Sequence, residues 1–263
     1  EWVLVLDADE KLNPKIIPDL EAAIADPNTL VVNLMRYEIG ASQSPYSLVS
    51  RLFRRHPKMQ FDRPYHAMID DSVAEILKEE SHWRIKDLPN VAIFHTGYQR
   101  AAIAKLEKST RAKLAMESYF KIHPNDPYVC SKLGAIYLGE GLSKQALKTL
   151  KQGLKYSAKE SPNLLYELHY HLANAFRQNY ETEKAIKHYK IAIDQPVLDK
   201  LKIGAYHNLG ALLQTLGKPD QAIAHHHSTL TIDPTFAAGY YNLGMAFKAL
   251  GQVGEAIAAY EKS

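Results

Sequence analysis

The sequence has one cysteine, no long apolar run and no strong excess of charge of either sign. Cys130 stands alone, which excludes internal disulfides and cysteine-based metal sites, so we expect its thiol to be a small buried side chain. No apolar segment approaches the roughly 20 residues that cross a bilayer, and no charged-then-apolar leader is visible. These absences predict a cytoplasmic protein without a transmembrane segment.

Charge excludes one more class of partner. The formal net charge is +3, with 12 Lys+Arg and 15 Asp+Glu in residues 1–100 and 20 against 14 in residues 101–263. Neither portion is basic enough to favour nucleic acid as a partner. With 263 residues, 46% of them hydrophobic and 23% charged, the chain is long enough for two cores.

Residues 1 to about 98 have a mixed α/β pattern. Runs rich in β-branched and aromatic residues, bounded by turn formers, predict strands over 3–6, 30–37, 47–54 and 91–95. Apolar residues at helical spacing predict helices over 13–25 and 72–80. After Gly97 the strand signal ends, and the rest of the chain is predicted to be helical.

The helical part repeats itself. A small residue recurs at Gly134, Ala173, Gly210 and Gly244, in steps of 39, 37 and 34 residues, and each is followed twelve residues later by an alanine. Large residues follow each alanine by four: Leu150, Tyr189, His226 and Tyr260. Small residues are needed where paired helices approach closely, and large ones fill the gaps.

This pattern resembles tetratricopeptide repeats, whose period is about 34 residues. The resemblance covers residues 127–263 with about four repeats, the last truncated. Residues 99–126 are then a connecting helix, a degenerate half repeat. The triplet His225-His226-His227 predicts no metal site, because adjacent helical side chains point about 100° apart.

The first residues combine an apolar strand with closely spaced acids. The run Trp2-Val3-Leu4-Val5-Leu6 leads into Asp7 and Asp9, which would point to one side on an extended backbone and could share a divalent cation with a diphosphate. A simpler alternative is that Asp9 or Asn13 ends the strand and caps the helix that begins near Pro14.

Four segments together resemble family 2 glycosyltransferases. The acidic motif is similar to the D-x-D segment of that family, Arg51 to Arg55 to its R-x-F-R strand, Tyr65-His66 to its usual His-Glu site, and residues 92–98 to its closing I-x-H-x-G-Y. The resemblance implies a partial A-type transferase domain over 1–98 that lacks the amino-terminal nucleotide-binding half. Both ends of the sequence look cut, which agrees with a fragment.

The resemblance implies an enzyme that moves a sugar from a nucleotide-sugar donor to an acceptor, with Mg²⁺ or Mn²⁺ as cofactor. Asp7, Asp9 and His95 would bind the metal, and Asp7, Asp9 and Arg54 the donor. Arg51 and Arg55 are weaker candidates for phosphate contacts. An ordinary strand-end histidine and solvent-facing arginines remain open as alternatives.

The sequence departs from the family at the position of the catalytic base, because Ala67 stands where family members often carry glutamate. Inverting transfer needs a carboxylate that accepts the proton of the acceptor hydroxyl. Asp70 and Asp71 could replace it, with Asp62 a weaker choice and His66 a further catalytic candidate; each could instead be a turn or helix-cap residue.

In the repeats, Asn208 and Asn242 each precede a Leu-Gly pair one repeat apart. Their side-chain amides could bind an extended peptide backbone, an arrangement that resembles the asparagine ladder of protein O-linked N-acetylglucosamine transferases. They could also follow the repeat consensus and bind only water. The open alternative for the whole chain is a non-enzymatic tetratricopeptide scaffold that carries a degenerate transferase remnant.

Overall fold

The computed structural model describes residues 1–41, 43–63, 68–96 and 102–263, with side chains described from residue 110 onward in the first long helix. Contacts divide the chain into two compact units, Glu1–Ala41 with Pro45–Lys108, and Ser42–Ser44 with Ser109–Ser263. The division therefore falls within a helix, at Lys108/Ser109. Each unit is described by itself below.

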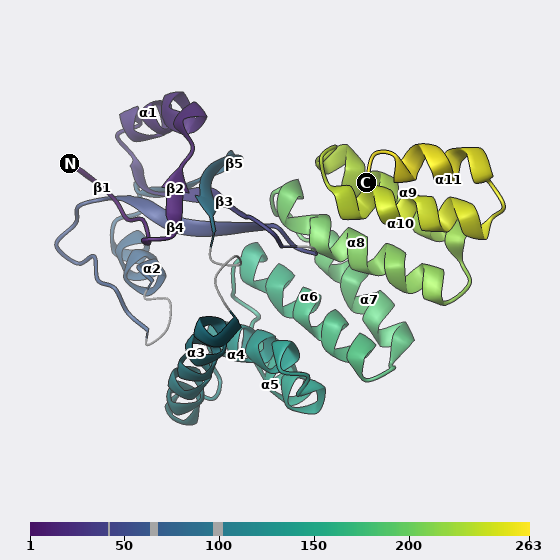
Figure 1. The fold of residues 1–263 in the computed structure, drawn as a ribbon. Coiled ribbons are helices and arrows are strands. Elements are labelled where there is room, and N and C mark those ends of the chain that lie inside the picture. Colours follow the sequence, from purple (N-terminus) through teal and green to yellow (C-terminus); the bar gives the residue numbers. More distant parts are fainter. Residues whose placement is uncertain (42, 64–67, 97–101) are drawn as a thin grey trace. The chain divides into compact units, whose positions relative to one another are not determined.

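The first unit is a five-stranded sheet with a helix on each face (Figure 1). Its strands, in sequence order, are β1 (Trp2–Leu4), β2 (Glu10–Leu12), β3 (Thr29–Glu38), β4 (Tyr46–Arg54) and β5 (Arg84–His95). In space the order is β1-β4-β3-β5-β2. Only β3 and β5 are parallel, and the other neighbours are antiparallel.

Two small cores lie on the two faces of this sheet. The short 3-10 turn η1 (Pro14–Ile16) and helix α1 (Ile17–Ala25) bury Ile16 and Leu20 against Val32, Leu34 and Ile93. On the other face, helix α2 (Asp70–Glu79) buries a second set of apolar residues: Leu30, Val31, Phe53, Ile69, Val73 and Ile76.

The sequence predicted four of these strands and both helices. It missed β2, because three residues are too few to show a period, and it began β5 at Val91 instead of Arg84. The first half of β5 hides the strand, since it contains the charged residues Arg84, Lys86 and Asp87 and five of its six residues are at least partly exposed.

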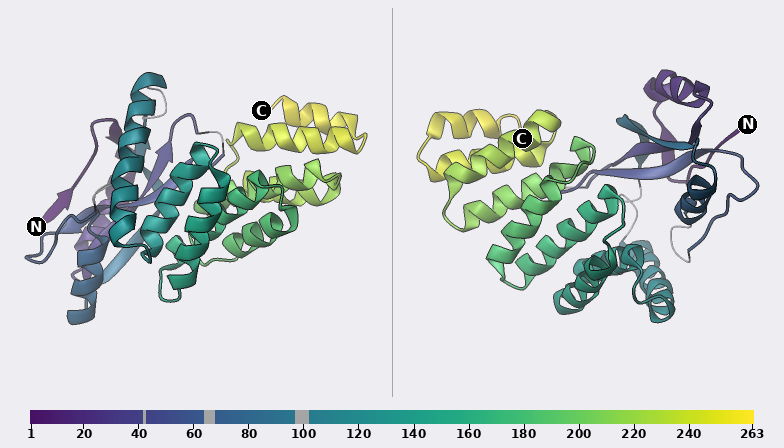
Figure 2. Two further views of the ribbon diagram at one scale, coloured as in Figure 1. Left: turned by 90° about the horizontal axis from the view of Figure 1, so that it is seen from below. Right: turned by 180° about the vertical axis from the view of Figure 1, so that it is seen from behind.

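From Ser109 onward, the regular elements described in the second unit are all helices (Figure 2). After α3 (Ala102–Ile122), which spans the division, four helix pairs follow: α4 (Pro127–Gly139) with α5 (Ser143–Tyr156), α6 (Pro162–Gln178) with α7 (Thr182–Ile193), α8 (Asp199–Thr215) with α9 (Pro219–Ile232), and α10 (Ala237–Ala249) with α11 (Val253–Tyr260). Every described helix is too short or too polar to cross a bilayer.

Local sequence signals explain where two of these helices begin. Asp126 caps α4 by accepting a hydrogen bond from the Val129 amide at 3.1 Å, and Ser161 caps α6 by accepting one from Leu164 at 3.3 Å. Proline follows each of these caps, where its missing N–H costs nothing.

The predicted close approach of paired helices is present in three of the four repeats. A Cβ built on Gly134 would lie 2.4 Å from the Leu150 side chain, and one on Gly210 would lie 2.5 Å from the His226 ring. Gly244 faces the Tyr260 ring in the same way, at 2.7 Å. Each of these three glycines of a first helix therefore makes room for the large residue of the second helix.

Cys130 is completely buried in α4, and burial raises the pKa of its thiol to about 12. The thiol is therefore the small buried side chain that the sequence predicted.

Candidate functional site

The predicted acidic motif lies on a closed turn of the first unit. The Glu10 amide donates to the Asp7 carbonyl oxygen at 2.9 Å, and the Asp7 amide donates to the Glu10 carboxylate at 2.9 Å. The prediction that Asp7 and Asp9 share one side of an extended strand is therefore wrong. The strand β1 ends at Leu4, and the turn aims the two carboxylates at different partners.

Each of these acids is paired with a basic group. The Asp7 carboxylate lies 2.5 Å from the Arg51 guanidinium, and the Asp9 carboxylate lies 3.5 Å from His95 Nε2. The other ring nitrogen of His95, Nδ1, lies 2.5 Å from the Glu38 carboxylate. The structure thus places His95 beside Asp9, at the end of β5.

These contacts belong to a larger group, which we name the charged cluster: Asp7, Asp9, Glu10, Arg36, Glu38, Arg51 and His95. Arg36 joins two of its acids, at 3.0 Å from Glu10 and 2.7 Å from Glu38. The side chain of Glu10 is fully buried, so its charge requires these partners. The sequence reasoning missed Glu10, Arg36 and Glu38, although alternating Arg36 and Glu38 at the end of an apolar strand were a usable signal.

The acidic and basic side chains of the charged cluster neutralise one another through these ion pairs. Its carboxylates are also oxygen ligands of the kind that hard cations prefer. Among the described residues, no group of three or more His, Cys, Asp or Glu side chains has the arrangement of a metal site. The divalent metal therefore stays a prediction from the sequence.

Arg54 does not point its guanidinium toward a phosphate site. Its Nε donates to the Thr29 carbonyl at 3.1 Å and its Nη2 to the Asp26 carbonyl at 3.2 Å. The guanidinium also lies over the ring of Trp2, at 4.7 Å from the centroid, and the ring of Trp83, at 5.6 Å. These contacts stabilise the packing of β4 against Thr29, Asp26 and Trp2. The donor-binding role of Arg54 stays a prediction from the sequence.

The candidate bases lie at the start of α2. Asp71 binds the Arg63 guanidinium through two 2.7 Å hydrogen bonds, and Asp70 accepts one from the Ser50 hydroxyl at 3.2 Å. Asp70 is exposed as a residue, but the protein atoms that surround its carboxyl group partly exclude water from it. This desolvation raises the pKa of the Asp70 carboxyl. Tyr65, His66 and Ala67 lie outside the described residues.

The two asparagines of the repeats have different surroundings. Asn208 is only 5% exposed, and its amide donates to the Tyr170 hydroxyl at 3.3 Å and to the Asn174 side-chain oxygen at 3.1 Å. Both acceptors belong to the preceding repeat, so Asn208 joins α8 to α6. Asn242 is half-buried, with its amide 3.5 Å from the His207 ring. A peptide-binding role stays a prediction for both, and Asn208 has little surface left for it.

Comparison with known proteins identifies the repeats. Two tetratricopeptide repeat family models match residues 203–232 and 237–263. A TPR repeat-containing protein of Synechococcus elongatus is 40% identical over 218 residues, which is 83% of this chain. The chain spans about half the length, 54%, of that curated relative.

Solved structures agree on the fold. The crystal structure of MamA is 28% identical, with a TM-score of 0.51 over 60% of this chain and 88% of that protein. The structure of pilF from Pseudomonas aeruginosa matches with a TM-score of 0.53 over 60% of this chain and 69% of its own, at 14% identity. The second match concerns the fold alone.

These findings overturn the predicted enzyme. The Synechococcus match is longer than the whole helical unit and so extends into the sheet unit, yet its protein is named for its repeats. The family models and the similar structures likewise give repeat proteins and no transferase. The glycosyltransferase prediction is wrong, and the nucleotide-sugar donor and catalytic roles assigned to the first unit lose their basis. The chain is a tetratricopeptide-type helical solenoid with a small mixed sheet.

Proposed function

We propose that this protein is a non-enzymatic scaffold whose repeats bind a peptide or a segment of another protein. The observation that carries the proposal is the stack of four helix pairs, because stacked repeats form extended surfaces that suit extended ligands. Within the stack, first helices contact the first helix of the next repeat, as α4 does with α6 and α8 with α10. We name the surface formed by α4, α6, α8 and α10 the first-helix face.

One end of the first-helix face carries an ion pair. Lys132 of α4 lies 2.6 Å from the Glu167 carboxylate of α6. Burial raises the pKa of Glu167, but the opposing effects of Lys132 lower it overall, so this carboxylate is ionised at neutral pH. The pair leaves this end of the face polar and nearly neutral.

The other end carries the exposed apolar side chains. Tyr241 and Met245, one helical turn apart on α10, are 53% and 43% exposed. Asn242 lies beside them with a half-buried amide. Tyrosine and methionine are frequent contact residues in interfaces that accept varied partners, and an amide can both donate to and accept from a peptide backbone. We place the peptide contact at this end.

The test is selection of binding peptides from a random library on the full chain, followed by affinity measurements on the best peptide. Tyr241→Ala/Met245→Ala should weaken binding at least about tenfold, which corresponds to about 1.4 kcal/mol. Tyr180→Gly, which removes a still more exposed tyrosine from the α6–α7 turn, is the control and should leave the affinity unchanged. Equal losses in both variants, or failure to select any peptide, would reject the proposal.

A further inference from the structure

The second helices of the first two repeats carry an unusual set of lysines. Helix α5 contains four lysines and no acidic residue, and α7 contains three lysines and one glutamate. The equivalent helices of the last two repeats, α9 and α11, contain no lysine. The packing of a repeat therefore does not require lysine at these positions, and the lysines are a particular feature of the surface formed by α5 and α7. We name it the lysine face: Lys144, Lys148, Lys151, Lys155, Lys184, Lys187 and Lys190.

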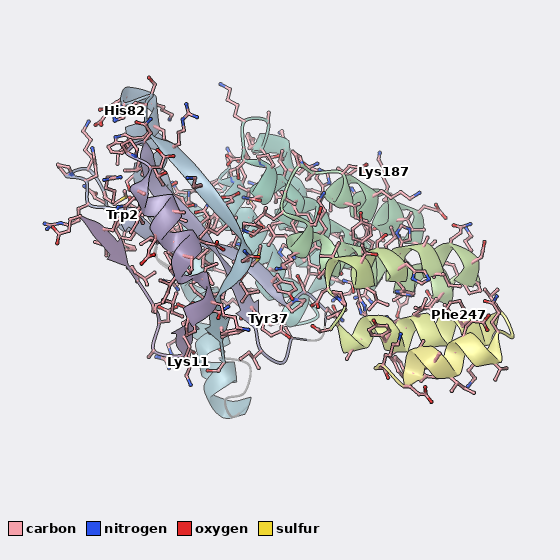
Figure 3. The ribbon with its side chains drawn as sticks, turned by 90° about the horizontal axis from the view of Figure 1, so that it is seen from above. Trp2, Lys11, Tyr37, His82, Lys187 and Phe247 are labelled. Atoms are coloured by element: carbon pink, nitrogen blue, oxygen red, sulfur yellow. The ribbon has the colours of Figure 1, made fainter. Side chains whose placement is uncertain are left out.

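All seven lysines are exposed, and their spacing along each helix places them on its outer side. The four in α5 stand at intervals of four, three and four residues and form one stripe, opposite the buried Ala146 and Leu150. Lys187 lies at the margin of the helical unit, with its side chain outward (Figure 3). Within the described part of the chain, only Lys184 of this set is in an ion pair, with Glu181.

Contacts with shared neighbours connect the lysines of α5 to those of α7. Lys151 of α5 and Lys184 of α7 lie over the same Phe176 ring, at 5.1 and 5.5 Å from its centroid. Lys151 and Lys187 both act on His188, whose pKa burial lowers to about 4 with smaller contributions from His169 and these two lysines. The lysine face is therefore one continuous surface across two repeats.

Like charges three and four residues apart repel one another on a helix, so this arrangement is unfavourable in the free protein. A bound anion would remove that repulsion. We propose that the lysine face is a second interaction surface, distinct from the first-helix face, and that it binds an acidic segment of another protein.

Carboxylates fit this surface better than lipid or nucleic acid does. The apolar sides of α5 and α7 are buried in the stack, for example Leu150 and Tyr189. Tyr156 is the one large apolar side chain that these two helices expose, which is too little apolar surface for insertion into a bilayer. Both helices lack arginine, whose fork suits phosphate. Lysines four residues apart are about 6 Å apart along a helix, close to the roughly 6.6 Å between alternate residues of an extended chain. A segment with an acid at every second position therefore matches the α5 stripe.

The probe is a fluorescein-labelled 12-residue peptide of alternating Glu and Ser, with a Gln/Ser peptide as its neutral control, measured by anisotropy on the full chain. The Glu/Ser peptide should bind at 50 mM NaCl and at least about tenfold more weakly at 300 mM, because salt screens exposed charges. Lys148→Glu/Lys187→Glu should weaken binding at least about tenfold, and Lys148→Arg/Lys187→Arg should retain it.

In Lys148→Glu/Lys187→Glu, each new glutamate lies three or four residues from remaining lysines and can form ion pairs with them. This variant should therefore fold, and circular dichroism checks that it does. Lys15→Glu/Lys218→Glu makes the same charge change elsewhere and should bind within about twofold of the parent. Tyr241→Ala/Met245→Ala should also bind normally, which separates this surface from the first-helix face. The proposal fails if both charge variants lose affinity equally, if the Gln/Ser peptide binds as well, or if phosphatidylserine vesicles or duplex DNA bind more tightly through the same lysines.

Discussion

Acidification should unfold the helical unit through its buried histidines, and His226 is the clearest case. Its side chain is completely buried against Gly210. Nε2 lies 3.0 Å from the Gln214 side-chain oxygen, whereas Nδ1 is buried with no hydrogen-bond partner among the described residues. Burial, with smaller effects of neighbouring histidines, lowers the pKa of this imidazole to about 3.

The sign and size of the effect follow from linkage. The unfolded chain takes up a proton near the ordinary histidine pKa of about 6.5, while folded His226 stays neutral until about pH 3. The free energy of unfolding is therefore highest above pH 6.5 and falls as the pH falls from 6.5 toward 3. Between pH 6.5 and 5 the loss from this one residue is about 2 kcal/mol, at 1.36 kcal/mol per pH unit.

The assay is urea unfolding of the parent and of His226→Phe at pH 7.5 and pH 5.0, followed by circular dichroism at 222 nm. Aromatic rings occupy the equivalent position in two other repeats, at Tyr189 and Tyr260, so phenylalanine should fit. The variant should lose about 2 kcal/mol less than the parent on acidification. His227→Phe, at an exposed neighbour, is the control, and parallel curves for parent and His226→Phe would refute the reasoning.

Three further predictions test the packing. Tyr180 has φ of 60° where the equivalent turns have glycines at 70–74°, so Tyr180→Gly should raise the free energy of unfolding by up to about 1 kcal/mol. Gly210→Ala places a Cβ 2.5 Å from a buried ring and should cost about 1–3 kcal/mol, whereas Gly254→Ala meets nothing within 4 Å. Asn208→Ala removes two inter-repeat hydrogen bonds and should cost about 1–3 kcal/mol. Urea unfolding at pH 7.5 measures all three.

Each of these three predictions has its own contradicting result. A destabilised Tyr180→Gly would show that the tyrosine side chain makes an interaction that outweighs its backbone strain. Equal costs at the two glycines would mean that the close approach of paired helices is relaxed without loss. If Asn208→Ala were as stable as the parent but no longer bound the selected peptide, Asn208 would act in peptide binding and not in joining the repeats.

The repeats could be predicted because their signal is redundant. Gly134, Gly210 and Gly244 each recur with an alanine and a large residue at fixed offsets, so many positions report the same packing. The strands β3 and β4 were predictable for a similar reason, since ten and nine residues are enough to show a strand.

The sites could not be predicted in the same way, because short motifs do not fix side-chain partners. Asp7 and Asp9 suggested a metal site, but the turn closed by Glu10 and the partners Arg51 and His95 depend on strands far apart in the sequence. Asn208 looked like a free amide on a helix, and only stacking of α8 on α6 buries it. Such contacts arise from tertiary packing, which local spacing does not encode.

The most direct test of the scaffold account is hydrogen–deuterium exchange of the full chain with and without the selected peptide. The account predicts that the peptide slows exchange in the first helices, most strongly in α10 around Tyr241 and Met245. Slower exchange at the charged cluster of the sheet, with none on the first-helix face, would contradict it.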